Sequence, residues 1–275
     1  MNTHTDIDDD EAEMNRLLGS GLAPLPIAQG KRTAVRGRLL GRVGRSLASL
    51  AGVAVVRQAE GAWRSLRRGV RVKDLWRGPG GSSVLIDIAP GAELPSHRHA
   101  HVEEGLILAG GLLVGDIDLG RGDYQVSPPG SKHRRMQASP EGCRAFLRGT
   151  ALGHAGALIG ELVGGMLPGA GPAATIVRAG EGAWREIAPG VEEKRLAAGG
   201  ESASRLLRLQ AGAALPARAQ AMAEELLVVD GDAYFDDLLL CSGDFLQAPA
   251  AARHGVLASD GGALLFLNGA VGEKA

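Results

Sequence analysis

The chain contains 275 residues, of which 45% are hydrophobic, so it can form one large domain or two ordinary ones with real cores. Its 30 basic and 31 acidic residues almost cancel, and this balance gives no reason to expect a nucleic-acid or membrane partner. Two cysteines and the absence of a signal-peptide or membrane-spanning pattern argue against a disulfide-stapled secreted domain and favour reduced thiols in the cytoplasm.

Residues 1–50 are predicted to divide into an acidic, disordered start and an amphipathic helix. Over residues 33–50, arginines alternate with apolar side chains at helical spacing, namely Val35, Leu39, Leu40, Val43 and Leu47. Two interpretations remain open. The helix docks onto a partner protein or nucleic acid, or it packs against the following domain or a second subunit of a homodimer with its arginines in water. The second interpretation is favoured.

Residues 51–150 are predicted to form a first domain made of β-strands. Short apolar runs at residues 83–88, 104–108 and 111–114 are separated by turn pairs such as Gly110-Gly111. This spacing is typical of an all-β sandwich or barrel.

Three histidines and one glutamate of this domain are spaced as metal ligands. His97, His99 and Glu103 are all odd-numbered, so an extended strand can point them to one side, and a strand returning after the turn at Gly130 can bring His133 beside them. Imidazole and carboxylate ligands suit zinc and also divalent iron, manganese or nickel. We therefore expect one divalent ion per chain, with zinc and iron favoured, and coordination positions left for water or a small-molecule ligand.

Neighbours of these four residues are expected to have structural roles. His101 is expected to be exposed, and Glu104, which has the opposite parity to Glu103, should form a salt bridge outside the barrel interior. Tyr124 either orients a bound small molecule or fills one end of the barrel, and filling is favoured.

Residues 151–174 are rich in Gly and Ala and are interpreted as a connector with a helical turn around residues 157–163. The chain then repeats itself at a constant offset of 121 positions. Gly61-Ala-Trp63-Arg64 recurs as Gly182-Ala-Trp184-Arg185, and no gap is needed from about residue 56 to 133. Residues 175–275 are therefore predicted to form a second domain with the same fold, in which Trp63 and Trp184 share a packing role.

The second copy does not keep the metal ligands. Its residues at the four equivalent positions are Arg218, Gln220, Glu224 and His254. A guanidinium offers no lone pair and repels a divalent cation, so no metal is expected there. We expect Arg218 to pair with Glu224, either in an inert core, which is favoured, or in a small pocket for an anion.

The first copy resembles the cupin superfamily. Gly91-(five residues)-His97-Arg-His99-(three)-Glu103-(six)-Gly110, followed by Gly122-(five)-Pro128-Pro-Gly130-(two)-His133, matches both motifs of that superfamily. More narrowly, Glu103-Glu104-Gly-Leu-Ile-Leu-Ala-Gly110 and Pro129-Gly-Ser-Lys-His133 resemble the cupin domain of the ChrR family of zinc-binding anti-sigma factors. The resemblance covers about residues 55–270.

The resemblance implies an all-β chain of two tandem cupin barrels, or double-stranded β-helices, with a short N-terminal helical segment. It also implies that His97, His99, Glu103 and His133 hold a metal in the first barrel, and that residues 1–50 contact a sigma factor or another regulatory protein. ChrR proteins carry an N-terminal zinc domain with a cysteine pair, whereas here no cysteine precedes Cys143. Residues 14–43 resemble only the end of that domain and its linker.

Three functions follow as hypotheses. The first is a ChrR-like regulatory protein that senses metal, small-molecule or oxidant state through the first barrel. The second is a mononuclear iron dioxygenase acting on a chelating diketone or phenolic substrate, because the ligand set leaves coordination positions open. The third is a metal-binding scaffold or storage protein without turnover.

Overall fold

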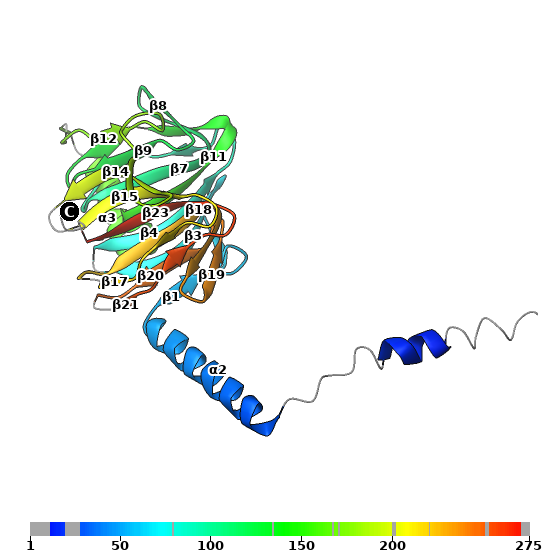
Figure 1. Cartoon of the computed structure of the whole chain (residues 1–275). Coiled ribbons are helices and arrows are strands. Elements are labelled where there is room, and N and C mark those ends of the chain that lie inside the picture. Colours follow the sequence, from blue (N-terminus) through cyan, green and yellow to red (C-terminus); the bar gives the residue numbers. More distant parts are fainter. Residues whose placement is uncertain are drawn as a thin grey trace, which may run out of the picture. The chain divides into compact units, whose positions relative to one another are not determined.

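The computed structural model describes residues 12–19, 28–78, 80–133, 135–166, 168–169, 171–199, 202–219, 221–250 and 253–270. The chain forms two compact units, Met1–Ala48 and Ser49–Ala275. The first unit contains a helix at residues 12–19 and most of helix α2, Gln29–Ser49 (Figure 1). The disorder expected at the acidic start falls largely on residues 1–11, which lie outside the described residues.

Helix α2 confirms the predicted amphipathic helix and begins at Gln29 rather than at residue 33. Its apolar positions are between 48% and 67% exposed, and they are Val35, Leu39, Leu40, Val43 and Leu47. An apolar stripe of this kind is usually covered by another surface.

The second unit consists of two antiparallel β-barrels with one topology, as the repeat predicts. The N-terminal barrel has the strand order β12-β9-β7-β11-β4-β3-β2, and the C-terminal barrel has the order β1-β20-β18-β23-β15-β14-β13. The strands of the first order run Thr175–Val177, Tyr124–Ser127, Glu103–Val114, Met136–Thr150, Gly81–Ile88, Val70–Gly78 and Trp63–Arg67. Those of the second order run Ala54–Val56, Phe245–Ala248, Glu224–Phe235, Ala263–Ala270, Ser202–Leu209, Val191–Gly199 and Arg185–Ala188.

Short strands complete each barrel. A two-stranded ribbon pairs β6 with β10 in the N-terminal barrel, and β17 with β21 in the C-terminal one. These strands are His97–Arg98, Lys132–His133, Arg218–Ala219 and Arg253–His254. The remaining short strands are β5 (Glu93–Leu94), β8 (Ile117–Gly120), β16 (Ala214–Leu215), β19 (Leu238–Cys241) and β22 (Leu257–Ala258).

The two barrels exchange a strand. β1 precedes the N-terminal barrel in the chain but pairs with β20 of the C-terminal barrel, and β12 precedes the C-terminal barrel but pairs with β9 of the N-terminal one (Figure 1). Each exchanged strand covers a sheet edge whose backbone N–H and C=O groups would otherwise lack partners. Sheet pairing therefore crosses the sequence boundary between the repeats.

Repeat-equivalent ion pairs hold both exchanged strands. Arg57 follows β1 and lies 2.8 Å from Asp244, while Arg178 follows β12 and lies 2.7 Å from Asp123. Each aspartate also accepts hydrogen bonds from backbone N–H groups at distances between 2.6 and 3.0 Å. These hydrogen bonds and the nearby arginine hold the pKa of each carboxyl below its usual value, although burial acts in the opposite direction.

A mixed aromatic and polar interface joins the barrels. Phe146 packs between Phe245 and Phe266, with ring centroids 6.1 and 5.1 Å away. Tyr124 is fully buried there and donates a 2.8 Å hydrogen bond to Glu104. Tyr124 therefore has a packing role, as favoured, but it packs between the two barrels and does not fill a barrel end.

Glu104 confirms its predicted salt bridge, which lies between the barrels. Arg148 contacts Glu104 at 3.1 Å and Glu225 of the other barrel at 3.2 Å. Glu104 and Glu225 are repeat-equivalent and also accept reciprocal hydrogen bonds from Ser204 and Ser83. One guanidinium therefore bridges two carboxylates at the interface and offsets part of their charge.

The two repeat-equivalent tryptophans lie at the interface between the barrels. Trp63 and Trp184 both pack against the interface core, which confirms their shared packing role. Cys143 and Cys241 are free thiols, and burial raises the pKa of Cys143 to about 12, so this thiol is poorly reactive.

Within the described part of the chain, no helix is both long and apolar enough to cross a membrane.

We expect Asp123→Ala to destabilise the protein by about 2–4 kcal/mol, because it removes the carboxylate partner of Arg178 and leaves two backbone N–H groups at a mostly buried site without their acceptor. Asp244→Ala should have a similar effect through β1. Urea denaturation measures both changes. Asp260→Ala, at an exposed position, is the control, with an expected effect within about 0.5 kcal/mol. Equal effects at Asp123 and Asp260 would contradict the anchoring role.

Candidate metal centre

The ribbon of β6 and β10 places His97 and His133 side by side. In its antiparallel register His133 lies opposite His97. Backbone hydrogen bonds of 3.0 and 2.8 Å join His99 to Ser131 and Gly130, which fixes the segment that follows β6. Glu103 enters from the first position of β7. The structure thus brings together the four residues that the sequence selects.

The four side chains form a compact cluster. One potential ligand atom from each of His97, His99, Glu103 and His133 lies within 4.8 Å of all the others. The three imidazole centroids are between 4.7 and 5.3 Å apart. This arrangement can surround a single ion.

His99 provides a test of whether the cluster fits a metal. Its side chain is almost completely buried, yet neither ring nitrogen has a hydrogen-bond partner among the described residues. The nearest carboxylate oxygen, on Glu103, is 3.8 Å from Nδ1. Buried polar atoms are rarely left without a partner, and a divalent ion would supply one. The donor set therefore fits a metal ion.

The protonation states also suit metal binding. Burial, followed by the charge of His97, lowers the pKa of His99 to about 3. Burial and His99 likewise lower the pKa of His133 to about 4, against a smaller opposing contribution from Glu103. Both imidazoles are consequently neutral near pH 7 and offer a nitrogen lone pair.

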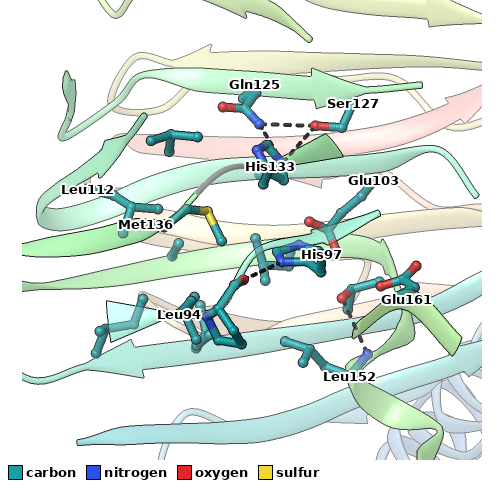
Figure 2. A pocket seen from close by; sticks show the side chains of 18 of the residues that line it. Leu94, His97, Glu103, Leu112, Gln125, Ser127, His133, Met136, Leu152 and Glu161 are labelled. Atoms are coloured by element: carbon teal, nitrogen blue, oxygen red, sulfur yellow. Dashed lines mark hydrogen bonds between the residues drawn. The ribbon is translucent and has the colours of Figure 1, made fainter. Parts of the chain in front are cut away.

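Hydrogen bonds outside the cluster orient two of its rings. His97 Nδ1 lies 3.0 Å from the Pro95 carbonyl oxygen, so when Nδ1 donates, Nε2 is left as the ligand atom. His133 Nε2 lies 3.0 Å from Gln125 Nε2 and 3.1 Å from Ser127 Oγ. Figure 2 shows Gln125 and Ser127 beside His133 at the edge of the pocket.

Gln125 and Ser127 were not selected from the sequence. Their repeat equivalents are Leu246 and Ala248, which are buried and apolar. A polar pair that occurs only in the copy with the metal motif is the signal that could have identified them.

The connector contributes a further residue that sequence analysis missed. It forms η1 (Ala151–Gly153) and the twelve-residue helix α3 (Ala155–Met166), which is longer than the expected helical turn. Glu161 of α3 is buried at the pocket and accepts a 3.1 Å hydrogen bond from the Ala100 backbone N–H. Burial raises its pKa. A Gly- and Ala-rich segment thus supplies a carboxyl group beside the metal ligands.

A cavity of about 370 Å³ extends from the cluster into the N-terminal barrel. Figure 2 shows His97, His133, Glu103 and Glu161 gathered on one side, and Leu94, Leu112 and Met136 on the other. The volume is in the range of small-molecule sites. His101, in contrast, is exposed, as expected.

The equivalent place in the C-terminal barrel keeps the backbone arrangement, since Arg218 pairs with His254 as His97 pairs with His133. The side chains of Arg218 and His254, and all of Gln220, lie outside the described residues. The expected Arg218–Glu224 pair stays a prediction. Glu224 itself is buried.

Comparison with known proteins agrees with the repeat. The family model of the ChrR cupin-like domain matches residues 51–152 of this sequence and again residues 172–271. A comparison with curated proteins gave no match.

Solved structures share the fold at low sequence identity. A "putative dioxygenase" from Nostoc punctiforme is 14% identical with a TM-score of 0.62, covering 81% of this chain and 84% of its own. A mutant oxalate decarboxylase from Bacillus subtilis is 18% identical with a TM-score of 0.59, covering 80% and 78%. The oxalate decarboxylase of Lactobacillus farciminis is 16% identical with a TM-score of 0.58, covering 78% and 85%.

Proposed function

This chain belongs to the ChrR cupin-like family and carries two copies of the family domain, and from this premise we propose that it is a metal-dependent regulatory protein. In this proposal the N-terminal barrel binds one divalent ion and a small molecule, and residues 1–50 contact a sigma factor or another transcription protein. The observation that carries the proposal is the cluster around the buried His99, whose ring nitrogens have no hydrogen-bond partner in the described part of the chain, at one end of a cavity.

The proposed ligands are His97, His99, Glu103 and His133, and the ion is zinc or iron, with manganese and nickel also compatible with the ligands. The one carboxylate among these ligands compensates part of the charge of a divalent cation. Ser127 would orient His133 by accepting a hydrogen bond from Nε2–H, which leaves Nδ1 as the ligand atom, and Pro95 would orient His97.

We expect the purified protein to contain about one equivalent of metal and the His99→Ala variant to lose most of it, because the ring is enclosed by the other three ligands. Elemental analysis by mass spectrometry measures this. His101→Ala, an exposed histidine two positions away, should keep the metal. Equal metal content in both variants, or none in the unaltered protein, would refute the proposed centre.

The exposed stripe of α2 supports a protein partner for the N-terminal segment. Five apolar side chains share this helix with several arginines and are between 48% and 67% exposed. Such a surface can bury apolar area in a complex while the arginines meet acidic groups at its rim. The same surface would also serve a homodimer.

We expect affinity capture with the full chain in extracts of its native host to recover a sigma factor or another transcription protein. The double variant Leu39→Ser/Leu40→Ser should reduce recovery at least about tenfold, because two anchors of the apolar stripe are removed. Leu113→Ser alters an exposed leucine of the barrel unit and should have no effect. Recovery of no such protein, or the same recovery with the stripe variant, would overturn the regulatory proposal.

We propose a cytoplasmic location from the state of the two cysteines. Both thiols are free, and the described structure places one in the core and one at the surface. Reduced thiols of this kind suit the cytoplasm, where a transcription partner would also be found.

A second candidate function is a mononuclear dioxygenase, favoured by the open cavity directly beside the proposed ligands. One structural relative, from Nostoc punctiforme, carries a dioxygenase description. A bound iron ion would supply the chemistry for reacting a chelating diketone or phenol with dioxygen. The chain's own residues would orient that substrate along the cavity and hold a proton on Glu161, whose pKa burial raises.

Oxygen consumption separates the two candidates. If the protein is a dioxygenase, the iron-loaded form should consume oxygen with a panel of β-diketones and catechols, well above an iron-treated His99→Ala control. Consumption at the control level with every compound would eliminate this function for the panel.

A further inference from the structure

Three positions in the wall of the cavity carry smaller side chains than their counterparts in the repeat. Matching the two barrels by sheet register pairs Gly105 with Leu226, Val114 with Phe235, and Ala145 with Leu265. All three of the larger residues are fully buried in the C-terminal core. The smaller side chains leave room for the cavity inside the N-terminal barrel.

Helix α3 closes one side of this hollow. Leu158 and Leu162 line the cavity, whereas their neighbours Ile159 and Val163 are exposed on the outer face. The helix lies close to the metal motif, because a Cβ atom at Gly165 would overlap the backbone of Ser96 and His97. Arg98 fixes the following segment through hydrogen bonds to the carbonyl groups of Gly164 and Gly169.

The wall of the cavity is polar around the candidate metal ligands and mostly aliphatic elsewhere. Beyond three of the candidate ligands (His97, Glu103 and His133) and Glu161, most lining residues are aliphatic, and no other aromatic side chain is among the described lining residues. Among the same residues Arg67 is the one lysine or arginine, and it is exposed. A compact dianion such as a dicarboxylate would leave the aliphatic wall uncovered and would find no buried cation except the metal.

We infer that the ligand of the N-terminal barrel is a molecule with a small metal-chelating head and a flexible aliphatic body, held between the barrel wall and α3. This inference rests on the proposed metal centre. The head would reach the ion beside His97 and His133, and the body would lie against Leu158 and Leu162. Helix α3, which belongs to neither repeat, would then determine which chain lengths are accepted.

Alkyl hydroxamates of increasing length test the inference, since their head chelates divalent metals and their tail can be lengthened two methylenes at a time. Cobalt-loaded protein is titrated with acetohydroxamate, butyrohydroxamate and hexanohydroxamate, and binding is followed by the visible absorption of the cobalt ion. Affinity should rise by about fourfold for each added methylene that is buried. Affinity that does not depend on chain length, or oxalate binding more tightly than hexanohydroxamate, would overturn the inference.

Variants of α3 and of the barrel wall test where the aliphatic tail of the hydroxamate binds. Leu158→Ser should weaken hexanohydroxamate binding by about tenfold and leave acetohydroxamate within about twofold, while Ile159→Ser, on the outer face of the same helix, should change neither. The double variant Val114→Phe/Ala145→Leu fills the cavity with the residues of the other repeat and should abolish the dependence on chain length. Identical behaviour of Leu158→Ser and Ile159→Ser would exclude α3 as the wall.

Metal content, measured for every variant, keeps this inference distinguishable from the proposed function. If the unaltered protein binds no cobalt, the metal centre itself is refuted. Full cobalt binding without dependence on chain length refutes only the aliphatic ligand. A circular dichroism spectrum matching the unaltered protein is required of each variant before its affinities are compared.

Discussion

The pairing of two very short strands, β6 and β10, is the contact on which the candidate site depends. It sets His133 opposite His97, and the two backbone hydrogen bonds of His99 continue the ribbon by one more position. Burial then keeps the His99 and His133 rings neutral, because desolvation opposes an imidazolium charge. The same enclosure that makes these rings costly to protonate makes them suitable for a metal.

Much of the architecture could be predicted from the sequence. The constant offset between the repeats predicts two barrels of one fold, and alternation along β7 predicts that Glu103 and Glu104 face opposite ways. The single extended strand expected through His97, His99 and Glu103 does not form, because β6 ends at Arg98 and β7 begins at Glu103. The exchange of β1 and β12 could not be predicted, because an offset gives the equivalence of two strands but not which sheet edge each one joins. Helix α3 was underestimated because its glycines resemble a linker, whereas Gly165 permits close packing on His97.

The two barrels differ in the size of their core side chains as well as in the candidate ligands. Gln125 and Ser127, which contact His133, are replaced by Leu246 and Ala248, and Gly105 and Val114 of the cavity wall are replaced by Leu226 and Phe235. Polar groups, candidate ligands and side-chain size therefore vary together between the copies. This joint variation supports the proposal that a small molecule binds in the N-terminal barrel.

The exchanged strands also bear on how such a chain can change over evolutionary time. A barrel excised at the boundary of its own repeat would lose an edge strand and keep one that belongs elsewhere, since Arg57 and Arg178 each anchor into the opposite half. Each copy therefore contributes a strand to its neighbour's sheet, independently of any ligand that it binds itself. Deletion of either copy would leave the other barrel with an unpaired sheet edge.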